Sequence, residues 1–121
     1  MLNQSPFLGP LFEGFVASEL LKSQINTGRR KELYYFRDQQ GLEVDFLVPA
    51  EDRHVRLIEV KASRTVTPAM AEPLRRLAKA MNKYHVSGFV VHRPAKEKAL
   101  TTALSPGIKA LPADALPFLK V

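Results

Sequence analysis

Two charged residues interrupt an apolar stretch of the chain, HVRLIEVKAS at positions 54–63. Side chains alternate along a strand, so Glu59 and Lys61 would project from the same face. A carboxylate beside an ammonium group in a core strand suits metal binding and chemistry on a phosphate group. The pair alone is a weak signal, because a solvated ion pair on an exposed sheet face explains most such patterns. A further acid facing Glu59 would make the chemical interpretation stronger.

Asp45 is that further acid. It lies in LEVDFLVP at positions 42–49, which predicts a strand just before the one that carries Glu59. If the intervening turn is centred on Asp52, Asp45 and Glu59 are each seven residues from it and lie opposite one another on one face. The other face of the earlier strand is predicted to be apolar and to consist of Leu42, Val44, Phe46 and Val48.

Two facing carboxylates repel by roughly 4 kcal/mol at about 4 Å and an effective dielectric near 20. A divalent cation reverses the sign of this interaction, and Mg²⁺ or Mn²⁺ prefers carboxylate oxygens and usually keeps waters. Lys61 would then hold or deprotonate the attacking water, or stabilise charge on a phosphate. Glu43, two positions from Asp45, is either an accessory ligand or a polar edge residue, and we favour the edge residue.

The first helix is predicted over positions 9–22, GPLFEGFVASELLK, and it offers another acid. Glu13 lies at the edge of its apolar stripe, where it would reach over the sheet, and Glu19 lies closer to the centre of the stripe. Either acid can be the ligand, although a structural role for Glu19, capping Lys61 or Arg37, is favoured. The stripe consists of Leu8, Leu11, Phe12, Phe15, Val16 and Leu20.

The remaining elements follow from periodicity and turn residues. Thr67 and Pro68 begin a helix that extends to about Met81, and HVSGFVVH at 85–92 is apolar enough to be a central strand. The order helix, three-strand meander, helix, strand predicts an α/β domain whose mixed central sheet is flanked by helices. Further elements are a strand at 32–38, a short helix at 96–104, a strand at 108–111 and a turn at 114–119.

The net charge of +6 and a pI near 9.8 favour a polyanionic partner, nucleic acid before anionic lipid. One face of the second helix is basic and would follow a phosphate backbone, although a solvated helix face is an equally good explanation. The three histidines lack metal-ligand spacing, so strand-end or surface roles are expected for them. The basic residues of the second helix are Arg75, Arg76, Lys79 and Lys83.

The 121 residues suit one domain, positions 1–121, and no stretch approaches the roughly 18 apolar residues of a membrane span. The chain contains no cysteine, and its first residues lack the pattern of a secretory signal, so a cytoplasmic location is expected. No catalytic serine or cysteine arrangement emerges. Nothing in the sequence indicates the oligomeric state.

Glu13, then VDFL with Asp45, then IEVKAS with Glu59 and Lys61 resembles the PD-(D/E)XK nuclease superfamily, which has a restriction-endonuclease-like core. GPLFE is similar to the start of the first helix in archaeal Holliday-junction resolvases of this fold, which favours Glu13 over Glu19. The resemblance implies Mg²⁺- or Mn²⁺-dependent hydrolysis of a DNA phosphodiester. Asp45, Glu59 and the backbone carbonyl of Val60 would hold the metal, Lys61 would act on the water, and Glu13 would complete the site.

A closer resemblance covers about the first half of the chain. GPLFEGFVASELLK, ELYYFRDQQGLEVDFLV and LIEVKAS look like hallmarks of the nuclease-like domain that follows the ATPase domain in a large family of prokaryotic AAA+ proteins. The chain has no Gly-x-x-x-x-Gly-Lys phosphate loop. The resemblance therefore implies a C-terminal domain excised from a longer ATPase, with the ATPase domain as its partner. A catalytically inactive module that binds DNA or a protein is the alternative.

Overall fold

The computed structural model describes residues 6–94 and 102–118. A long helix precedes three strands, and a short 3-10 turn and a second helix lead to the fourth strand. The elements are α1 (Leu8–Asn26), β1 (Tyr34–Arg37), β2 (Glu43–Pro49), β3 (His54–Lys61), η2 (Pro68–Ala71), α2 (Glu72–Ala80), β4 (His85–His92), β5 (Thr102–Ser105), β6 (Ile108–Pro112) and η3 (Ala113–Phe118).

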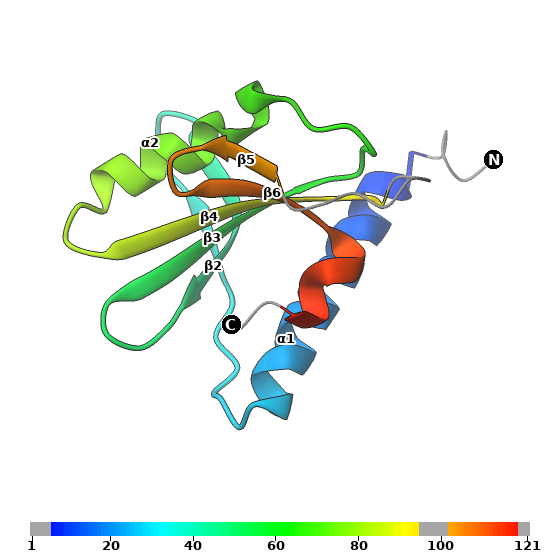
Figure 1. Cartoon of the computed structure of the whole chain (residues 1–121), viewed down its shortest axis with the longest axis horizontal. Coiled ribbons are helices and arrows are strands. Elements are labelled where there is room, and N and C mark those ends of the chain that lie inside the picture. Colours follow the sequence, from blue (N-terminus) through cyan, green and yellow to red (C-terminus); the bar gives the residue numbers. More distant parts are fainter. Residues whose placement is uncertain (1–5, 95–101, 119–121) are drawn as a thin grey trace.

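The strands form one mixed sheet in the order β1-β2-β3-β4-β6-β5. The neighbours β1, β2 and β3 pair antiparallel, whereas β4 lies parallel to β3 and to β6. Because α2 lies between β3 and β4 in the chain, it links two parallel neighbours across the sheet. The prediction of a mixed sheet flanked by helices is confirmed, as is the interior position of β4 (Figure 1).

Helices cover both faces of the sheet, and each face has its own apolar core (Figure 1). On one face, α2 buries Leu74 and Leu77 against β3 and β4. On the other face, Val16 and Leu20 of α1, together with η3, pack against β2, β3 and β4. Within the described residues, no helix is long and apolar enough to cross a membrane.

The register of β2 and β3 is the one predicted from the sequence. Phe46 pairs with Ile58 and Pro49 with Val55, so the hairpin is centred on Asp52. Its turn has Asp52 at φ 57° and Arg53 at φ 60°, and the His54 N–H donates to the Glu51 carbonyl. Positive φ at both central residues is the geometry of a type I′ turn, whose twist matches that of the flanking strands.

The predicted single apolar face of β2 is wrong, because the strand contains a bulge. Tyr34 of β1 pairs with Leu47, whereas Phe36, two residues later, pairs with Val44, three residues earlier in β2. The extra residue moves the alternation by one step. Val44 therefore packs in the core beneath α2, while Val48 packs in the core beneath α1.

The predicted stripe on α1 is only partly buried. Val16 and Leu20 are buried and Phe12 packs against the core, but Leu11 is 59% exposed and Phe15 49% exposed. The helix also extends further than predicted, to Asn26. The stripe is only partly buried because α1 meets the sheet along a narrow line, formed by Val16, Leu20 and the buried side chain of Gln24. Gln24 lies beyond the predicted end of the helix, so this contact also accompanies the longer helix.

Two other predictions need correction. The 3-10 turn η2 replaces the start of the predicted helix at Pro68, and the helix at 96–104 falls mostly outside the described residues. Its described part, 102–104, belongs to β5 instead. Pro106 and Gly107, the latter at φ 78°, turn the chain from β5 into β6, and Pro-Gly is a typical type II turn signal. The strand predicted at 108–111 is confirmed as β6.

Candidate functional site

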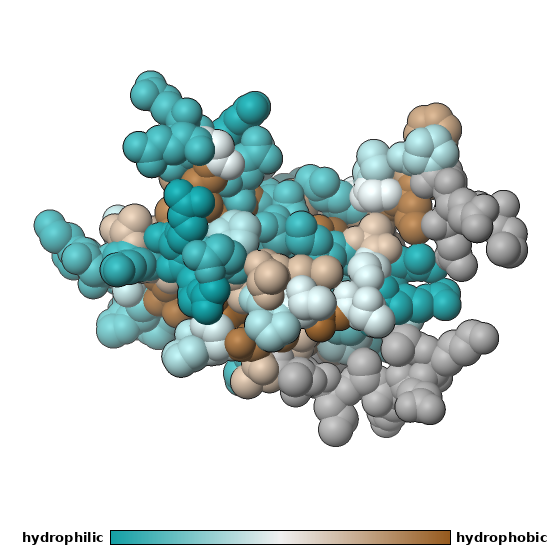
Figure 2. Space-filling view, turned by 90° about the horizontal axis from the view of Figure 1, so that it is seen from above, coloured by the Kyte–Doolittle hydropathy of each residue, from teal (hydrophilic) through white to brown (hydrophobic). Residues whose placement is uncertain are grey.

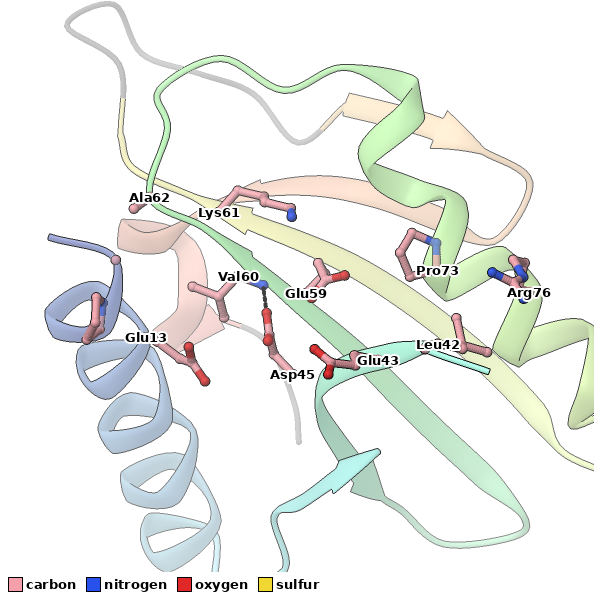
Figure 3. A pocket seen from close by; sticks show the side chains of 13 residues that line it. Glu13, Leu42, Glu43, Asp45, Glu59, Val60, Lys61, Ala62, Pro73 and Arg76 are labelled. Carbon is pink, nitrogen blue, oxygen red and sulfur yellow. Dashed lines mark hydrogen bonds between the residues drawn. The ribbon is translucent and has the colours of Figure 1, made fainter. Parts of the chain in front are cut away.

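Three of the predicted acids, Glu13, Asp45 and Glu59, converge at the amino end of β2 and the carboxyl end of β3, between the two helices. They line a cavity of about 520 Å³ that opens between the first turns of α1 and the start of α2 (Figure 3). The cavity is lined by Gly9, Pro10, Glu13, Gly41, Leu42, Glu43, Asp45, Glu59, Val60, Lys61, Ala62, Pro73 and Arg76. Three elements, α1, β2 and β3, therefore supply the groups that were expected to act together, and α2 closes the cavity.

Asp45 lies at the bulge, where the backbone pairing of β2 and β3 stops. The last described pair is Phe46 with Ile58, and beyond it the Val60 N–H donates to the Asp45 carboxylate at 2.8 Å (Figure 3). The carboxylate takes a hydrogen bond that a strand carbonyl would otherwise accept. Bulges next to sites commonly re-aim a side chain, and here the bulge holds Asp45 beside Glu59.

Glu59 is buried, with 6% of its surface exposed. Burial, together with hydrogen bonding and repulsion from Asp45, raises its pKa from 4.5 to about 8, although the Lys61 ammonium opposes the shift. Burial and the charge of Asp45 likewise raise the pKa of Glu13, which projects from α1 toward Asp45 (Figure 3). Crowding of three acids that Lys61 opposes only in part is therefore the main electrostatic feature of the cavity.

The two accessory acids each pair with a basic residue of their own element or of a neighbouring strand. Glu19 does not line the cavity and pairs with Lys22 at 3.5 Å, so it caps neither Lys61 nor Arg37 as was expected. Glu43 does line the cavity, but its carboxylate pairs with Arg37 at 3.1 Å. This favours Glu13 as the helix acid and an edge role for Glu43.

The basic face predicted on α2 is exposed. Figure 2 views the molecule from the side of this helix and shows hydrophilic residues gathered over it. Arg76 faces the acidic cavity, whereas Arg75 pairs with Glu72 on the same helix. Lys79 lies beside Arg75 in a neighbouring hollow, and Lys83 is exposed in the turn that follows. Of these four residues, only Arg76 lines the acidic cavity.

The donor set fits a hard divalent cation. Across residues 6–94 and 102–118, no group of three or more His, Cys, Asp and Glu side chains is arranged to hold a metal ion. Mg²⁺ needs fewer protein ligands, because it is usually bound through one or two carboxylates and keeps several waters. Asp45 and Glu59 provide two adjacent carboxylates whose mutual repulsion a cation would relieve.

The chain matches the family model described as Domain of unknown function (DUF4143) over residues 8–116. The chain belongs to this family. The match extends from the start of α1 to η3 and so includes every element that lines the acidic cavity of this DUF4143 domain. No curated protein and no solved structure matches the chain.

Other residues line the acidic cavity of the DUF4143 domain without having been assigned to the predicted metal site. Pro73 and Arg76 contribute from α2, and Gly9 and Pro10 contribute from the first turn of α1. The position of α2 depends on the crossover between β3 and β4, for which local sequence offered no signal. His92 does not line this cavity: it ends β4, as the expected strand-end role implies, and it is buried with its Nδ1 within hydrogen-bond distance of the Arg93 carbonyl.

Proposed function

We propose that this domain is a PD-(D/E)XK-type nuclease that hydrolyses phosphodiester bonds in DNA with Mg²⁺ or Mn²⁺. The observation that supports this best is the convergence of Asp45, Glu59, Glu13 and Lys61 in one cavity. The order of helix, meander, helix and strand supports a restriction-endonuclease-like core. The same proposal includes attachment of this domain to an AAA+ ATPase domain and a cytoplasmic location.

Each residue has a role that its position supports. Asp45 and Glu59 would hold the cation, with the Val60 carbonyl as a further ligand and Glu13 as an outer acid. A bound Mg²⁺ or Mn²⁺ supplies Lewis acidity toward the phosphate and lowers the pKa of a bound water. Lys61, which faces the same cavity, would hold the attacking water or the phosphate charge, and Arg76 would bind a neighbouring phosphate.

A noncatalytic module that binds DNA or a protein for the ATPase is the second candidate. The observation that favours it is the pKa of Glu59, which burial and Asp45 raise to about 8. A protonated Glu59 can hydrogen-bond to the carboxyl group of Asp45 at neutral pH without a cation. Cation affinity at neutral pH therefore separates the two functions.

Calorimetric titration of Mn²⁺ tests the proposal directly. The wild-type chain should bind Mn²⁺, and Asp45→Asn and Glu59→Gln should each weaken binding by more than about 100-fold, since loss of even indirect ligand partners weakens metal binding ~10–100-fold. Glu19→Gln is the matched control, because it removes an acid of α1 outside the cavity. Its affinity should equal that of the wild type.

The outcome also decides between the candidates. Absence of Mn²⁺ binding by a folded wild-type chain would contradict the nuclease proposal and leave the binding module. If Mn²⁺ binds as expected, Lys61→Met should abolish cleavage of duplex DNA while changing Mn²⁺ affinity little. The cleavage assay should include the full-length ATPase, so that a missing partner is not mistaken for a missing activity.

A further inference from the structure

The sheet carries a second polar group at the amino end of β3, on the face that α1 covers. Ile58 packs in the core beneath α1, and strand alternation places Arg56 and His54 on the same face, progressively further from the acidic cavity. Arg56 and Lys61 are separated by roughly 16 Å along the strand at about 3.3 Å per residue. The two groups therefore occupy opposite ends of β3.

The parallel neighbour β4 extends this polar group. His85 pairs in register with His54, and their rings stack with centroids 4.9 Å apart. Ser87 pairs in register with Arg56 and is exposed. The turns that contain the ends of these strands lie at the left of Figure 1, away from the first turns of α1. This part of the sheet face is thus open to solvent and polar.

Arg56 and Arg29 are the unusual members of the group. Arg56 is half-buried, and its pKa is lowered by burial and by the charge of Arg29, which follows α1. In the part of the chain that the structure describes, neither guanidinium lies within ion-pair distance of a carboxylate. By contrast, other arginines are paired: Arg30 with Glu32, Arg37 with Glu43, and Arg75 with Glu72.

The two carboxylates that share a hollow with Arg29 form no ion pair with it. Arg29 lines a hollow of about 220 Å³ together with Glu32 and Glu51. Arg30 holds Glu32 at 3.7 Å, and no described ion pair joins Glu51 to either guanidinium. Gln24 anchors this hollow, because its side chain donates to the Glu32 carbonyl at 2.8 Å and accepts from the Glu32 N–H at 3.2 Å.

The hollow that Arg29 lines also contains Pro49 and Ala50, which directly follow Val48, the β2 partner of Arg56, so both arginines lie beside the carboxyl end of β2. Together they present up to ten N–H donors, five on each, and no acceptor. Partial burial removes water that would otherwise satisfy them, and the like charges repel. A phosphate group supplies both the opposite charge and the paired oxygens that match the guanidinium fork. We propose that Arg29 and Arg56 form a phosphate-binding site, bordered by His54, His85 and Ser87, which is separate from the acidic cavity and does not depend on the nuclease proposal.

Calorimetric titration of inorganic pyrophosphate into the whole chain tests this site. EDTA in the buffer removes divalent cations, so that binding at the acidic cavity through a metal does not contribute. Arg56→Gln and Arg29→Gln should each weaken pyrophosphate binding about tenfold or more, since a charge-assisted hydrogen bond contributes roughly 1.5–3 kcal/mol. Arg56→Lys should retain part of the affinity, because it keeps the charge but loses the fork.

Arg64→Gln is the matched control, because it removes an exposed arginine beyond the other end of β3. Competition with a short DNA duplex identifies the source of the phosphate: displacement of pyrophosphate indicates a nucleic-acid backbone, and no displacement indicates a small phosphate compound. Either result supports a phosphate site.

Three outcomes would overturn the proposal. The first is no pyrophosphate binding at millimolar concentration, and the second is an equal loss of affinity in Arg64→Gln. The third is binding of Zn²⁺, without EDTA, that disappears in His54→Ala and His85→Ala while pyrophosphate does not bind. This last result would make the stacked histidines a cation site, since neutral imidazole is a good Zn²⁺ ligand. If Arg56→Gln fails to fold, Arg29→Gln still decides the matter.

Discussion

The two ends of β3 carry groups of opposite charge that are crowded by like charges. At the carboxyl end, burial and Asp45 raise the pKa of Glu59, whereas at the amino end burial and Arg29 lower the pKa of Arg56. In both places a like charge from a segment distant in sequence opposes ionisation of a group in the strand. A group crowded by like charges thus lies at each end, and the sign of that charge is the reason why we propose a cation at one end and a phosphate at the other.

A substitution that disrupts the packing of the sheet between the two ends of β3 should have the largest effect on stability. A Cβ added at Gly88 would lie 2.9 Å from Ile108 Cγ1 and 3.4 Å from Leu74 Cδ1. Gly88→Val should therefore lower the free energy of unfolding by about 3 kcal/mol, since overpacking a core forces its neighbours to move. Urea denaturation followed by circular dichroism measures this change.

Gly88→Ala is the graded control and should have a smaller effect of about 1 kcal/mol. Gly88→Val should bind both proposed ligands, Mn²⁺ and pyrophosphate, more weakly than the wild type, because a larger fraction of the variant is unfolded. If the valine variant is as stable as the wild type, Ile108 can move aside, and the sheet is less rigid there than the contacts indicate.

Glu59→Gln should produce the next largest effect, and it depends on pH. The raised pKa keeps Glu59 protonated in the folded state between about pH 4.5 and pH 8, where the unfolded state has released that proton. The wild type must then lose stability as pH rises across this window, and the loss is complete above pH 8. The glutamine variant should be more stable by about 2 kcal/mol at pH 9, after allowance for solvent screening, and equal near pH 4.

Urea denaturation of both chains at several pH values checks this prediction. Glu72→Gln controls for the loss of an exposed acid, because Glu72 pairs with Arg75 on the helix surface. A constant difference between Glu59→Gln and the wild type from pH 4 to pH 9 would mean that Glu59 is not the group that titrates.

Arg56→Met tests the other end in the same way. Methionine keeps much of the apolar stem of arginine and removes the half-buried charge, so stability should rise by about 1 kcal/mol while pyrophosphate binding is lost. Thermal unfolding with and without pyrophosphate measures both effects, since a ligand that binds only the folded state raises its Tm. A variant that is less stable and still binds pyrophosphate would remove the parallel between the two ends.

The acidic end was largely predictable from the sequence, and the basic end was not. A single turn centred on Asp52 fixes the register of β2 and β3, so Asp45 and Glu59 could be paired by counting residues. The bulge in β2 could not be predicted, because the alternation of Leu42, Val44, Phe46 and Val48 is apolar in either arrangement. The fold class could be predicted from the order of the helices and strands, because each of these elements has its own local sequence pattern.

The basic end depends on contacts between distant segments. His54 meets His85 because the crossover through α2 sets a parallel register, and no short motif specifies that register. Gln24 fastens the segment after α1 to the backbone of Glu32, and Arg29 of this segment lines a hollow with Pro49 and Ala50 at the end of β2. Local periodicity contains neither relation. The predicted strand-end positions of the histidines are confirmed, since His54 begins β3 and His85 and His92 begin and end β4.

A substitution in the turn between β2 and β3 should have the smallest effect on stability. It sharpens the comparison between the two ends of β3, because it alters the residues of neither proposed site. Arg53 has φ 60°, which is strained for a residue with a side chain, and it follows Asp52 at φ 57°. Arg53→Gly should raise the free energy of unfolding by about 0.5–1 kcal/mol, since glycine is favoured at this position of a type I′ turn and its greater freedom in the unfolded chain offsets part of the gain. Urea denaturation measures the change, and Arg64→Gly, at an exposed position outside the hairpin, should give no stabilisation.

The same substitution should leave the stacking of His54 on His85 intact. The reason is that the Arg53 carbonyl accepts the His85 N–H at 2.8 Å, and glycine keeps that carbonyl. A destabilised Arg53→Gly variant would show that the arginine side chain itself holds the amino end of the sheet together.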